Sequence, residues 1–301
     1  MRFFTIHMNI GVIILNYVAY NVTIKCVKSF FKQSIDLKKD NVDFVIVDNF
    51  SENESYQVLK DYFNKQKNVA VVKTNKNLGF ANGNNFGYNF LTTHFEKKYD
   101  FVICSNSDVI LNEDGLYDWI KNCMNKYNFA VLGPSVYSVY GKFHQNPVSN
   151  MSLNIHELNK QLCKMQITKI KILIKKLTDI PAKASEVQTW KSEYKDASDC
   201  FTLHGSFQIF SYLYFEKYNE PYDSSTFLYM EENILKVRCL KEKLSMWYDP
   251  DYEIQHLQSY STSKLSKDIN TKNYFRMKNM CKSMKEYIRN VRNYEESKTI
   301  E

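Results

Sequence analysis

The sequence predicts an α/β fold in which a doubly wound, mostly parallel sheet is flanked by helices. Three observations support this prediction. Continuous Val- and Ile-rich runs are bounded by polar turns, as in strands covered on both faces, and helical stretches separate these runs. The chain has 301 residues, 44% of them hydrophobic, which suffices for one large or two modest domains with a sizeable core. Ligands of such sheets bind beyond the carboxyl ends of the strands, so functional residues are expected there.

The first half of the chain alternates the two kinds of element. Apolar runs without a helical period predict strands over 10–15, 43–47, 69–73, 100–105 and 129–136. Longer stretches between them predict helices over 20–31, 54–66, 80–95 and 113–127.

The pattern changes near Gly141. A polar connection leads to a basic helix over 155–177 and a linker over 181–199. A strand over 201–210, a helix over 227–240 and one or two short strands within 244–256 follow, and a basic helix over 264–292 closes the chain. We therefore expect one domain over 1–263, whose halves meet near residue 140, and a basic helical tail over 264–301.

Composition and patterning exclude several classes of protein. Only 8 glycines and 5 prolines exclude collagen-like and low-complexity chains. The longest apolar run, 10–15, is far shorter than the roughly 20 residues of a membrane-spanning helix, and no secretory leader is recognisable. Seven cysteines stand singly without zinc-like spacing, so we expect reduced thiols in a cytosolic protein. A formal charge of +7 is compatible with an anionic partner.

Three strand or helix boundaries carry polar residues that bear on chemistry. Asp48 ends the second strand, where a carboxylate can accept hydrogen bonds from a ribose or base; a turn or a helix N-cap is the alternative. Gly79, Gly83 and Gly87 are spaced by four, so they permit either close packing of a helix on the sheet or, with Asn77, contact with an anion or sugar. Asp108 leaves the fourth strand, where it suits a hard divalent cation or a simple turn.

The second half adds two acids and a histidine. Glu231 and Glu232 follow an aromatic run, and only one of two neighbouring helical residues can point squarely into a pocket. That glutamate can act as a general base, whereas a solvated helix start is the alternative. His256 follows a short strand and is either structural or a ligand of a metal or phosphate.

The order and spacing of these motifs resemble those of the family 2 glycosyltransferases of the GT-A fold, especially the bacterial branch that builds capsular and O-antigen polysaccharides. The resemblance spans about residues 10–263. It is carried by Asn16, Val47-Asp48-Asn49, Asn77-Leu78-Gly79-Phe80, Asn106-Ser107-Asp108, Leu203-His204-Gly205-Ser206, Tyr229-Met230-Glu231-Glu232 and His256.

The resemblance implies an inverting transfer from a nucleotide-diphospho-sugar, with a UDP or dTDP sugar as donor and Mg²⁺ or Mn²⁺ as cofactor. Glu232 matches the usual catalytic base, with Glu231 beside it, and Asp108 and His256 match residues at the metal. The implied donor-binding residues are Asn16, Asp48, Asn49, Asn77, Gly79, Asn106, Ser107 and Asp108, and the implied acceptor or sugar subsite is His204, Gly205 and Ser206. Asn106 departs from the family pattern by replacing the first acid of the DxD motif, and Glu232 departs by replacing an aspartate.

On this reading residues 1–140 form the donor half and residues 141–263 the acceptor half of the domain. The acceptor is a saccharide, expected to be lipid-linked, and nucleic acid is not expected as a partner. The alternative from another functional class is a binding or scaffold protein: a transferase fold that holds nucleotide but does not catalyse transfer. A nucleotidyltransferase is disfavoured because no Gly-rich basic loop follows the first strand.

The basic tail allows two interpretations. Its lysines and arginines, with apolar residues such as Met284, Tyr287 and Ile288, are typical of a helix that lies on an anionic membrane surface, here the inner face of the cell membrane. In the alternative, the apolar side packs on the catalytic domain. The helix over 155–177 is a second basic surface of the same type.

Overall fold

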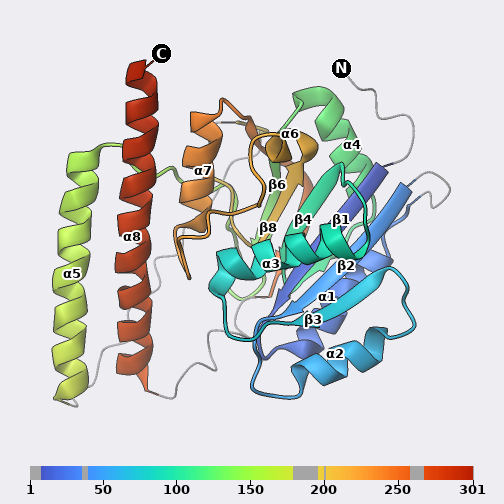
Figure 1. Ribbon diagram of the computed structural model, residues 1–301, viewed down its shortest axis with the longest axis horizontal. Helices are drawn as coiled ribbons and strands as arrows, with labels where there is room; N and C mark the ends of the chain where they lie inside the picture. The colour runs from blue at the N-terminus through green and yellow to red at the C-terminus, as the bar shows by residue number, and fades with distance from the viewer. Residues whose placement is uncertain (1–7, 36–39, 179–195, 200, 258–267, 301) are drawn as a thin grey trace.

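In the computed structural model, the fold is a central twisted sheet with helices on both faces and a further pair of helices at one end (Figure 1). The structure describes residues 8–35, 40–178, 196–199, 201–257 and 268–300. Its strands are β1 (Met8–Asn16), β2 (Asp40–Asp48), β3 (Val69–Lys73), β4 (Phe101–Asn106), β5 (Val109–Leu111), β6 (Val131–Ser138), β7 (Phe143–His144), β8 (Phe207–Ser211) and β9 (Met246–His256). Its helices are α1 (Tyr20–Phe31), α2 (Ser55–Phe63), α3 (Gly79–His94), α4 (Leu116–Tyr127), α5 (Ile155–Leu177), α6 (Tyr212–Phe215), α7 (Glu231–Lys241) and α8 (Ile269–Ile300).

The strands form one sheet in the order β3-β2-β1-β4-β8-β6-β9-β5, and β7 pairs with β6. Neighbours within β3-β2-β1-β4 are parallel, as are β6 and β9, whereas β8 is antiparallel to both β4 and β6. The predicted α/β class is confirmed. Because β8 joins β4 to β6, the sheet continues across residue 140.

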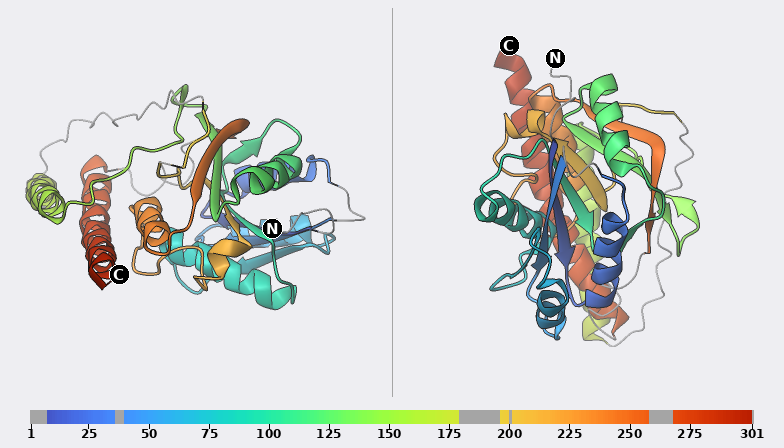
Figure 2. Two further views of the ribbon diagram at one scale, coloured as in Figure 1. Left: turned by 90° about the horizontal axis from the view of Figure 1, so that it is seen from above. Right: turned by 90° about the vertical axis from the view of Figure 1, so that its right-hand side faces the viewer.

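Alternate residues of the parallel strands face opposite layers of the core. Ile14 belongs to a buried cluster with residues of α1, α2 and α4, while Ile13 belongs to a second cluster with residues of α3, α6 and α7. Figure 2 shows these layers from above, with the sheet between α1 and α4 on one side and α3 and α6 on the other. Both faces are covered, which explains why the strands are continuous apolar runs in the sequence.

A third layer extends beyond the sheet. Leu158 of α5, Ile234 and Val237 of α7, and Met284 and Tyr287 of α8 belong to one buried cluster. Helix α8 contacts both α5 and α7, so it lies between them, and α5 is the outermost helix at this end (Figure 1). No helix within the described ranges is long and apolar enough to cross a bilayer.

Two predicted element starts are wrong. The strand expected over 201–210 begins at Phe207, and the helix expected over 227–240 begins at Glu231, because Tyr229 and Met230 have left-handed backbone with φ of 74° and 69°. Of the one or two short strands expected within 244–256, the structure has one, β9. The expected boundary at 263, and most of the linker over 181–199, lie outside the described residues.

Candidate functional site

The residues expected to bind the donor lie at the carboxyl ends of adjacent parallel strands. In the sheet register, Asn16 at the end of β1 is opposite Asp48 at the end of β2, and Leu15 is opposite Asn106 at the end of β4. Parallel strands direct these ends to one edge, which is where ligands of open α/β sheets bind.

The carboxylate of Asp48 is fully buried and hydrogen-bonded within the protein. Its Oδ2 accepts from Asn16 Nδ2 at 2.8 Å, and its Oδ1 accepts from the Ser51 amide at 3.0 Å. Asn16 Oδ1 in turn accepts from the Thr23 hydroxyl of α1 at 2.8 Å. The contact with Ser51 is the local turn given above as the alternative for Asp48. Contact of Asp48 with a nucleotide stays a prediction.

Asn49 connects the end of β2 to the turn that starts α3. Its Oδ1 accepts from the Leu78 amide and its Nδ2 donates to the Gly79 carbonyl, both at 2.9 Å. Gly79 has φ of +78°, and a Cβ there would lie 2.0 Å from the Phe227 carbonyl oxygen. Only glycine fits this close approach of two backbones.

Gly83 and Gly87 have a different role from Gly79. A Cβ at Gly83 would lie 2.6 Å from Leu15 Cδ1, and one at Gly87 would lie 2.5 Å from Ile13 Cγ2. These two glycines therefore allow α3 to pack closely on β1, which is the packing alternative considered for the series.

Asp108 and His256 face each other across the ends of β4 and β9. His256 Nε2 is 3.3 Å from Asp108 Oδ1, and His256 Nδ1 is 2.8 Å from Gln145 Oε1. An amide oxygen can only accept, so Nδ1 donates a proton to Gln145, and Nε2 is the ring atom that faces the carboxylate. That contact is satisfied either by a proton on Nε2 or by a cation held between Nε2 and the carboxylate.

One carboxylate and one imidazole are a small donor set for a divalent cation. No group of three or more His, Cys, Asp or Glu side chains able to hold a metal exists among the residues that the structure describes. If Asp108 and His256 hold Mg²⁺ or Mn²⁺, water or phosphate oxygens must therefore complete the shell. Gln145 would act behind them by fixing the His256 tautomer.

The loop before β8 adds a neutral imidazole. The Ser206 amide donates to His204 Nδ1 at 3.2 Å, and the His204 ring lies 5.7 Å from the His256 ring. Burial, with a smaller contribution from the charge of His256, lowers the pKa of His204 to about 3. At neutral pH His204 therefore has an Nε2–H donor without a positive charge. The Asn106 amide donates to the Ser206 carbonyl at 2.8 Å, which joins this loop to the end of β4.

The two glutamates at the start of α7 have different surroundings. Glu231 is buried, with 6% of its surface exposed, and its Oε1 lacks a hydrogen-bond partner within the described parts of the chain. Burial and the neighbouring charge of Glu232 raise the pKa of Glu231 to about 8. Burial also raises the pKa of Glu232, whose Oε2 lies 4.0 Å from the position of a Cβ at Gly205. Of the two, Glu232 therefore faces the loop of His204.

Four non-glycine residues with left-handed backbone lie next to the predicted site residues. They are Val18, Phe50, Tyr229 and Met230, with φ between 50° and 74°. Such conformations are costly for side chains with a Cβ, and they concentrate at functional sites. Their positions, after β1, after β2 and before Glu231, mark the same edge of the fold.

Direct contacts link most of these positions into one continuous region. Asp108 contacts His256, whose ring neighbours that of His204; the next residue, Gly205, faces Glu232 and the ring of Phe80. Phe80 follows Gly79, and Asn49 bonds to Gly79 beside Asp48. The region thus combines a candidate cation site, a neutral imidazole and a carboxyl group with a raised pKa. That combination can stabilise a leaving anion and accept a proton.

Three residues of this region were not found from the sequence. Gln145 supports His256, the Tyr222 ring meets that of Phe80 at 5.1 Å, and Phe50, two residues after β2, is 43% exposed. An exposed aromatic residue directly after a buried strand is the one sequence signal that could have identified Phe50. Gln145 has no local signal, because its role depends on strand pairing.

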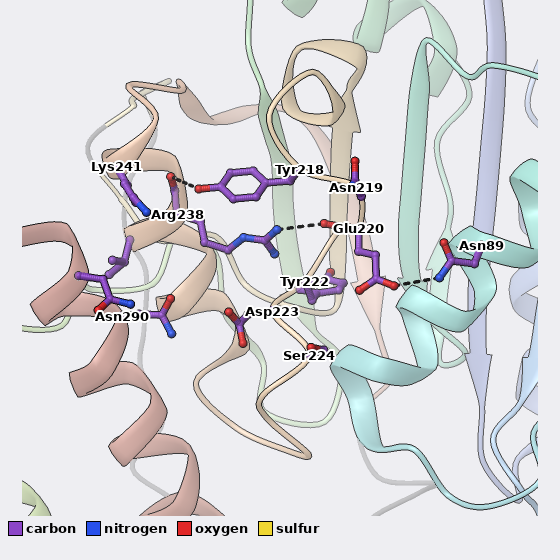
Figure 3. A pocket seen from close by; sticks show the side chains of 12 residues that line it. Asn89, Tyr218, Asn219, Glu220, Tyr222, Asp223, Ser224, Arg238, Lys241 and Asn290 are labelled. Atoms are coloured by element: carbon purple, nitrogen blue, oxygen red, sulfur yellow. Dashed lines mark hydrogen bonds between the residues drawn. The ribbon is translucent and has the colours of Figure 1, made fainter. Parts of the chain in front are cut away.

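A cavity of about 610 Å³ adjoins this region at Tyr222 and lies between the second half of α7, α8 and the segment 218–224. Figure 3 shows its lining, where Glu220 accepts from Asn89 and the Arg238 guanidinium donates to backbone carbonyls. Arg238 also stacks on the Tyr218 ring at 3.9 Å. The charged groups of Glu220 and Arg238 thus already have hydrogen-bond partners within the protein. None of the predicted site residues lines the cavity.

Comparison with known proteins identifies a family. The family model described as "Glycosyl transferase family 2" matches residues 11–182, more than half of the chain. No curated protein matches significantly.

Solved structures of S. aureus TarS are similar in fold. The complex of TarS 1-349 with UDP has 14% sequence identity and a TM-score of 0.53, and the match covers 84% of this chain and 61% of that one. The complex with UDP-GlcNAc has 13% identity and a TM-score of 0.52, and covers 86% and 62%. This chain thus spans about three fifths of the TarS chains that it matches.

Proposed function

The chain belongs to glycosyl transferase family 2, and we propose that it transfers a sugar from a nucleotide-diphospho-sugar to a hydroxyl group of a saccharide acceptor. The observation that carries the proposal is the position of Glu232. Its carboxyl group has a raised pKa and faces the His204 loop, which in turn lies beside the pair of Asp108 and His256. A proton acceptor and an anion-stabilising site are therefore adjacent.

The donor is proposed to bind at the strand ends over the asparagine network. TarS crystallises with UDP and with UDP-GlcNAc, which supports a nucleotide sugar as donor for this chain. UDP and dTDP sugars are the first candidates. In this proposal Asn49, Asn77 and Gly79 shape the wall of the nucleotide site, and Asn106, Ser107 and Asp108 meet the diphosphate. Asn16 and Asp48 lie buried behind this site, where the hydrogen bond between their side chains joins the ends of β1 and β2.

Asp108 and His256 would hold Mg²⁺ or Mn²⁺, which when bound neutralises the charge that develops on the departing nucleoside diphosphate. Asn106 cannot supply a carboxylate, so Asp108 is the one acid of its motif available to that cation. The Nε2–H of neutral His204 adds a hydrogen-bond donor near the same charge.

Glu232 is proposed as the general base. Its raised pKa increases its ability to take the proton from the attacking acceptor hydroxyl. Attack from the face opposite the leaving group, in one displacement, inverts the anomeric carbon. Gly205 leaves room for the acceptor in front of Glu232, because a Cβ there would have the Phe80 ring at 3.7 Å and Glu232 at 4.0 Å. Glu231 is not chosen because, of the two glutamates, Glu232 is the one whose carboxyl oxygen lies beside Gly205.

We place this reaction in the building of a cell-surface polysaccharide, in the capsular or O-antigen class. The transferred unit would be a hexose or deoxyhexose, and the acceptor a lipid-linked saccharide at the cytoplasmic face of the cell membrane. The basic surface of α5 and α8 supports a location beside an anionic membrane.

The test is a screen of UDP-, dTDP- and GDP-sugars for a rise in melting temperature with Mn²⁺ present, followed by transfer assays with the sugar that stabilises most. Stabilisation by one nucleotide sugar and turnover that Glu232→Gln abolishes support the proposal. Stabilisation without turnover on any acceptor, including water, assigns the chain to the nucleotide-holding alternative. No stabilisation by any donor contradicts the proposed donor site.

A further inference from the structure

Helix α5 is apolar on two faces, and the described parts of the chain cover only one of them. Its inner face packs through Leu158, with Leu162 and Met165, in the cluster shared with α7 and α8. Its outer face has a second row of apolar side chains at spacings of four, three, four and three residues. This outer row consists of Cys163, Ile167, Ile170, Ile174 and Leu177.

The outer row is exposed along its length. Ile167, Ile170 and Ile174 are 53–54% exposed and Leu177 is 75% exposed, which are high values for large aliphatic side chains. Alternating spacings of four and three keep these residues on one side of a helix. Since α8 covers the opposite side, the row faces away from the protein, at the end of the molecule farthest from α2 (Figure 1).

Most apolar residues of α8 are not available in the same way. Met284, Tyr287 and Ile288 are buried at 1–4% exposure against α5 and α7. The interpretation in which the apolar side of the C-terminal helix packs on the protein therefore describes these three residues. Ile269, the first residue of α8, is 49% exposed, so the exposed apolar surface at this end consists mainly of the outer row of α5.

The charge around the outer row is strongly positive. Segments 163–177 of α5 and 268–283 of α8 together contain nine basic residues and one acid, Asp268. The Lys176 ammonium lies 5.7 Å from the Tyr274 ring, so these two segments are neighbours. Lys164, Lys171 and Lys175 are exposed beside the row.

The positive charge around the outer row indicates which kind of partner binds there. In a pair of identical chains joined along the row, the lysines of both copies would meet, and like charges at such flanking positions oppose association. A single acidic helix of a partner protein would pair with the lysines beside the outer row, but it would leave the positive charge that continues over α8 uncovered. We infer that the outer row of α5 inserts shallowly into an anionic lipid bilayer, with the lysines at the headgroups.

The experiment is sedimentation of the full chain with vesicles of phosphatidylcholine alone or with about a third phosphatidylglycerol. Three variants are compared. The first, Ile170→Gln with Ile174→Gln, removes insertion, and the second, Lys164→Gln, Lys171→Gln and Lys175→Gln, removes charge. The control, Lys25→Gln, Lys65→Gln and Lys67→Gln, removes the same charge from exposed lysines near α1 and α2, at the other end of the molecule. Unchanged melting temperatures establish that each variant folds.

We expect the chain to bind anionic vesicles at least tenfold more tightly than neutral ones, the first two variants to lose at least fivefold in binding, and the control to bind as the parent does. Binding that ignores lipid charge, or that survives both variants, overturns the inference. A dimer in solution that Ile170→Gln with Ile174→Gln dissociates would assign the row to a second copy instead.

This inference deepens the membrane location within the proposed function but uses no catalytic residue. All three variants should stabilise with donor and act on a soluble acceptor as the parent does. Vesicle binding without any turnover would refute the proposed catalysis and leave the inference standing, and turnover without vesicle binding would do the reverse.

Discussion

The Nε2 atom of His256 lies 3.3 Å from Oδ1 of Asp108, at the ends of two strands that are far apart in the sequence. Gln145 accepts a hydrogen bond from the opposite nitrogen of the ring at 2.8 Å, so Nε2 is the atom that faces the carboxylate. A proton on Nε2 or a cation between the two atoms would satisfy this contact, and binding of Mn²⁺ distinguishes the two.

The first prediction concerns Gln145. Gln145→Leu should weaken binding of Mn²⁺ in the presence of UDP by about tenfold or more, because the His256 tautomer is no longer fixed. Calorimetry or electron paramagnetic resonance of Mn²⁺ gives the affinity without an activity assay. Gln66→Leu, at an exposed position, is the control. An unchanged Mn²⁺ affinity in Gln145→Leu, together with loss of affinity in Asp108→Asn, would exclude His256 from the cation site.

The second prediction separates the two glutamates. Glu232→Gln should lower kcat by about a hundredfold or more with donor affinity little changed, since only the proton acceptor is lost. Glu231→Gln should have the milder effect. Rates and donor affinities of both variants decide the matter, and the opposite ranking would assign the base to Glu231.

A pH profile tests the same assignment independently. The base must be unprotonated, and the pKa of Glu232 is raised by burial, so kcat of the parent should rise with pH beyond the range of an ordinary carboxylate. The residual activity of Glu232→Gln should lack this rise. A rise that persists in the variant would belong to another group.

The third prediction is a change in the pH dependence of stability. The pKa of Glu231 rises from 4.5 to about 8 on folding, so the folded chain binds its proton more tightly than the unfolded chain does. Its contribution to stability is therefore complete below pH 4.5 and is lost as pH rises toward 8. Glu231→Gln mimics the protonated acid and should melt about 2 °C or more above the parent at pH 9, but not at pH 4.5. Glu216→Gln, at an exposed site, should change neither value; equal shifts at both pH values in Glu231→Gln would contradict the expectation.

The fourth prediction concerns Gly79. Both Gly79 and Gly115 have positive φ, at 78° and 96°, but a Cβ at Gly115 meets no atom within 4 Å. Gly115→Ala should therefore cost only the strain of the left-handed backbone, about 1–2 kcal/mol. Gly79→Ala should cost clearly more, because its Cβ would also collide with the Phe227 carbonyl. Denaturant unfolding of both variants measures the difference, and equal losses would rule out a contribution from the collision.

The sequence was most informative where the chain is regular. The bounds of α1, β3 and α5 agree with the predicted ranges, because apolar periodicity alone determines those elements. β5 and β7 were not predicted, since three- and two-residue strands exist only through pairing with β9 and β6. The start of α7 was misplaced because backbone strain at Met230 leaves no compositional trace.

The candidate site shows the same division. The positions of Asn49 and Asp108 at strand ends could be predicted, because the chain marks those ends with polar residues after apolar runs, whereas Glu232 was expected inside a helix over 227–240. Their partners could not. Gln145 reaches His256 through a register that joins segments 111 residues apart, and the burial that separates Glu231 from Glu232 arises only when α7 packs.

The backbone bond from the Phe80 amide to the Phe227 carbonyl, 2.8 Å long, has a mechanical consequence. Asn49 holds the turn at Gly79 from one side, and on the other side the chain runs five residues from Phe227 to Glu232. A backbone hydrogen bond thus joins the turn that we propose to border the nucleotide to the segment that leads to the proposed base. A substitution that displaces the turn is therefore expected to displace Glu232 as well.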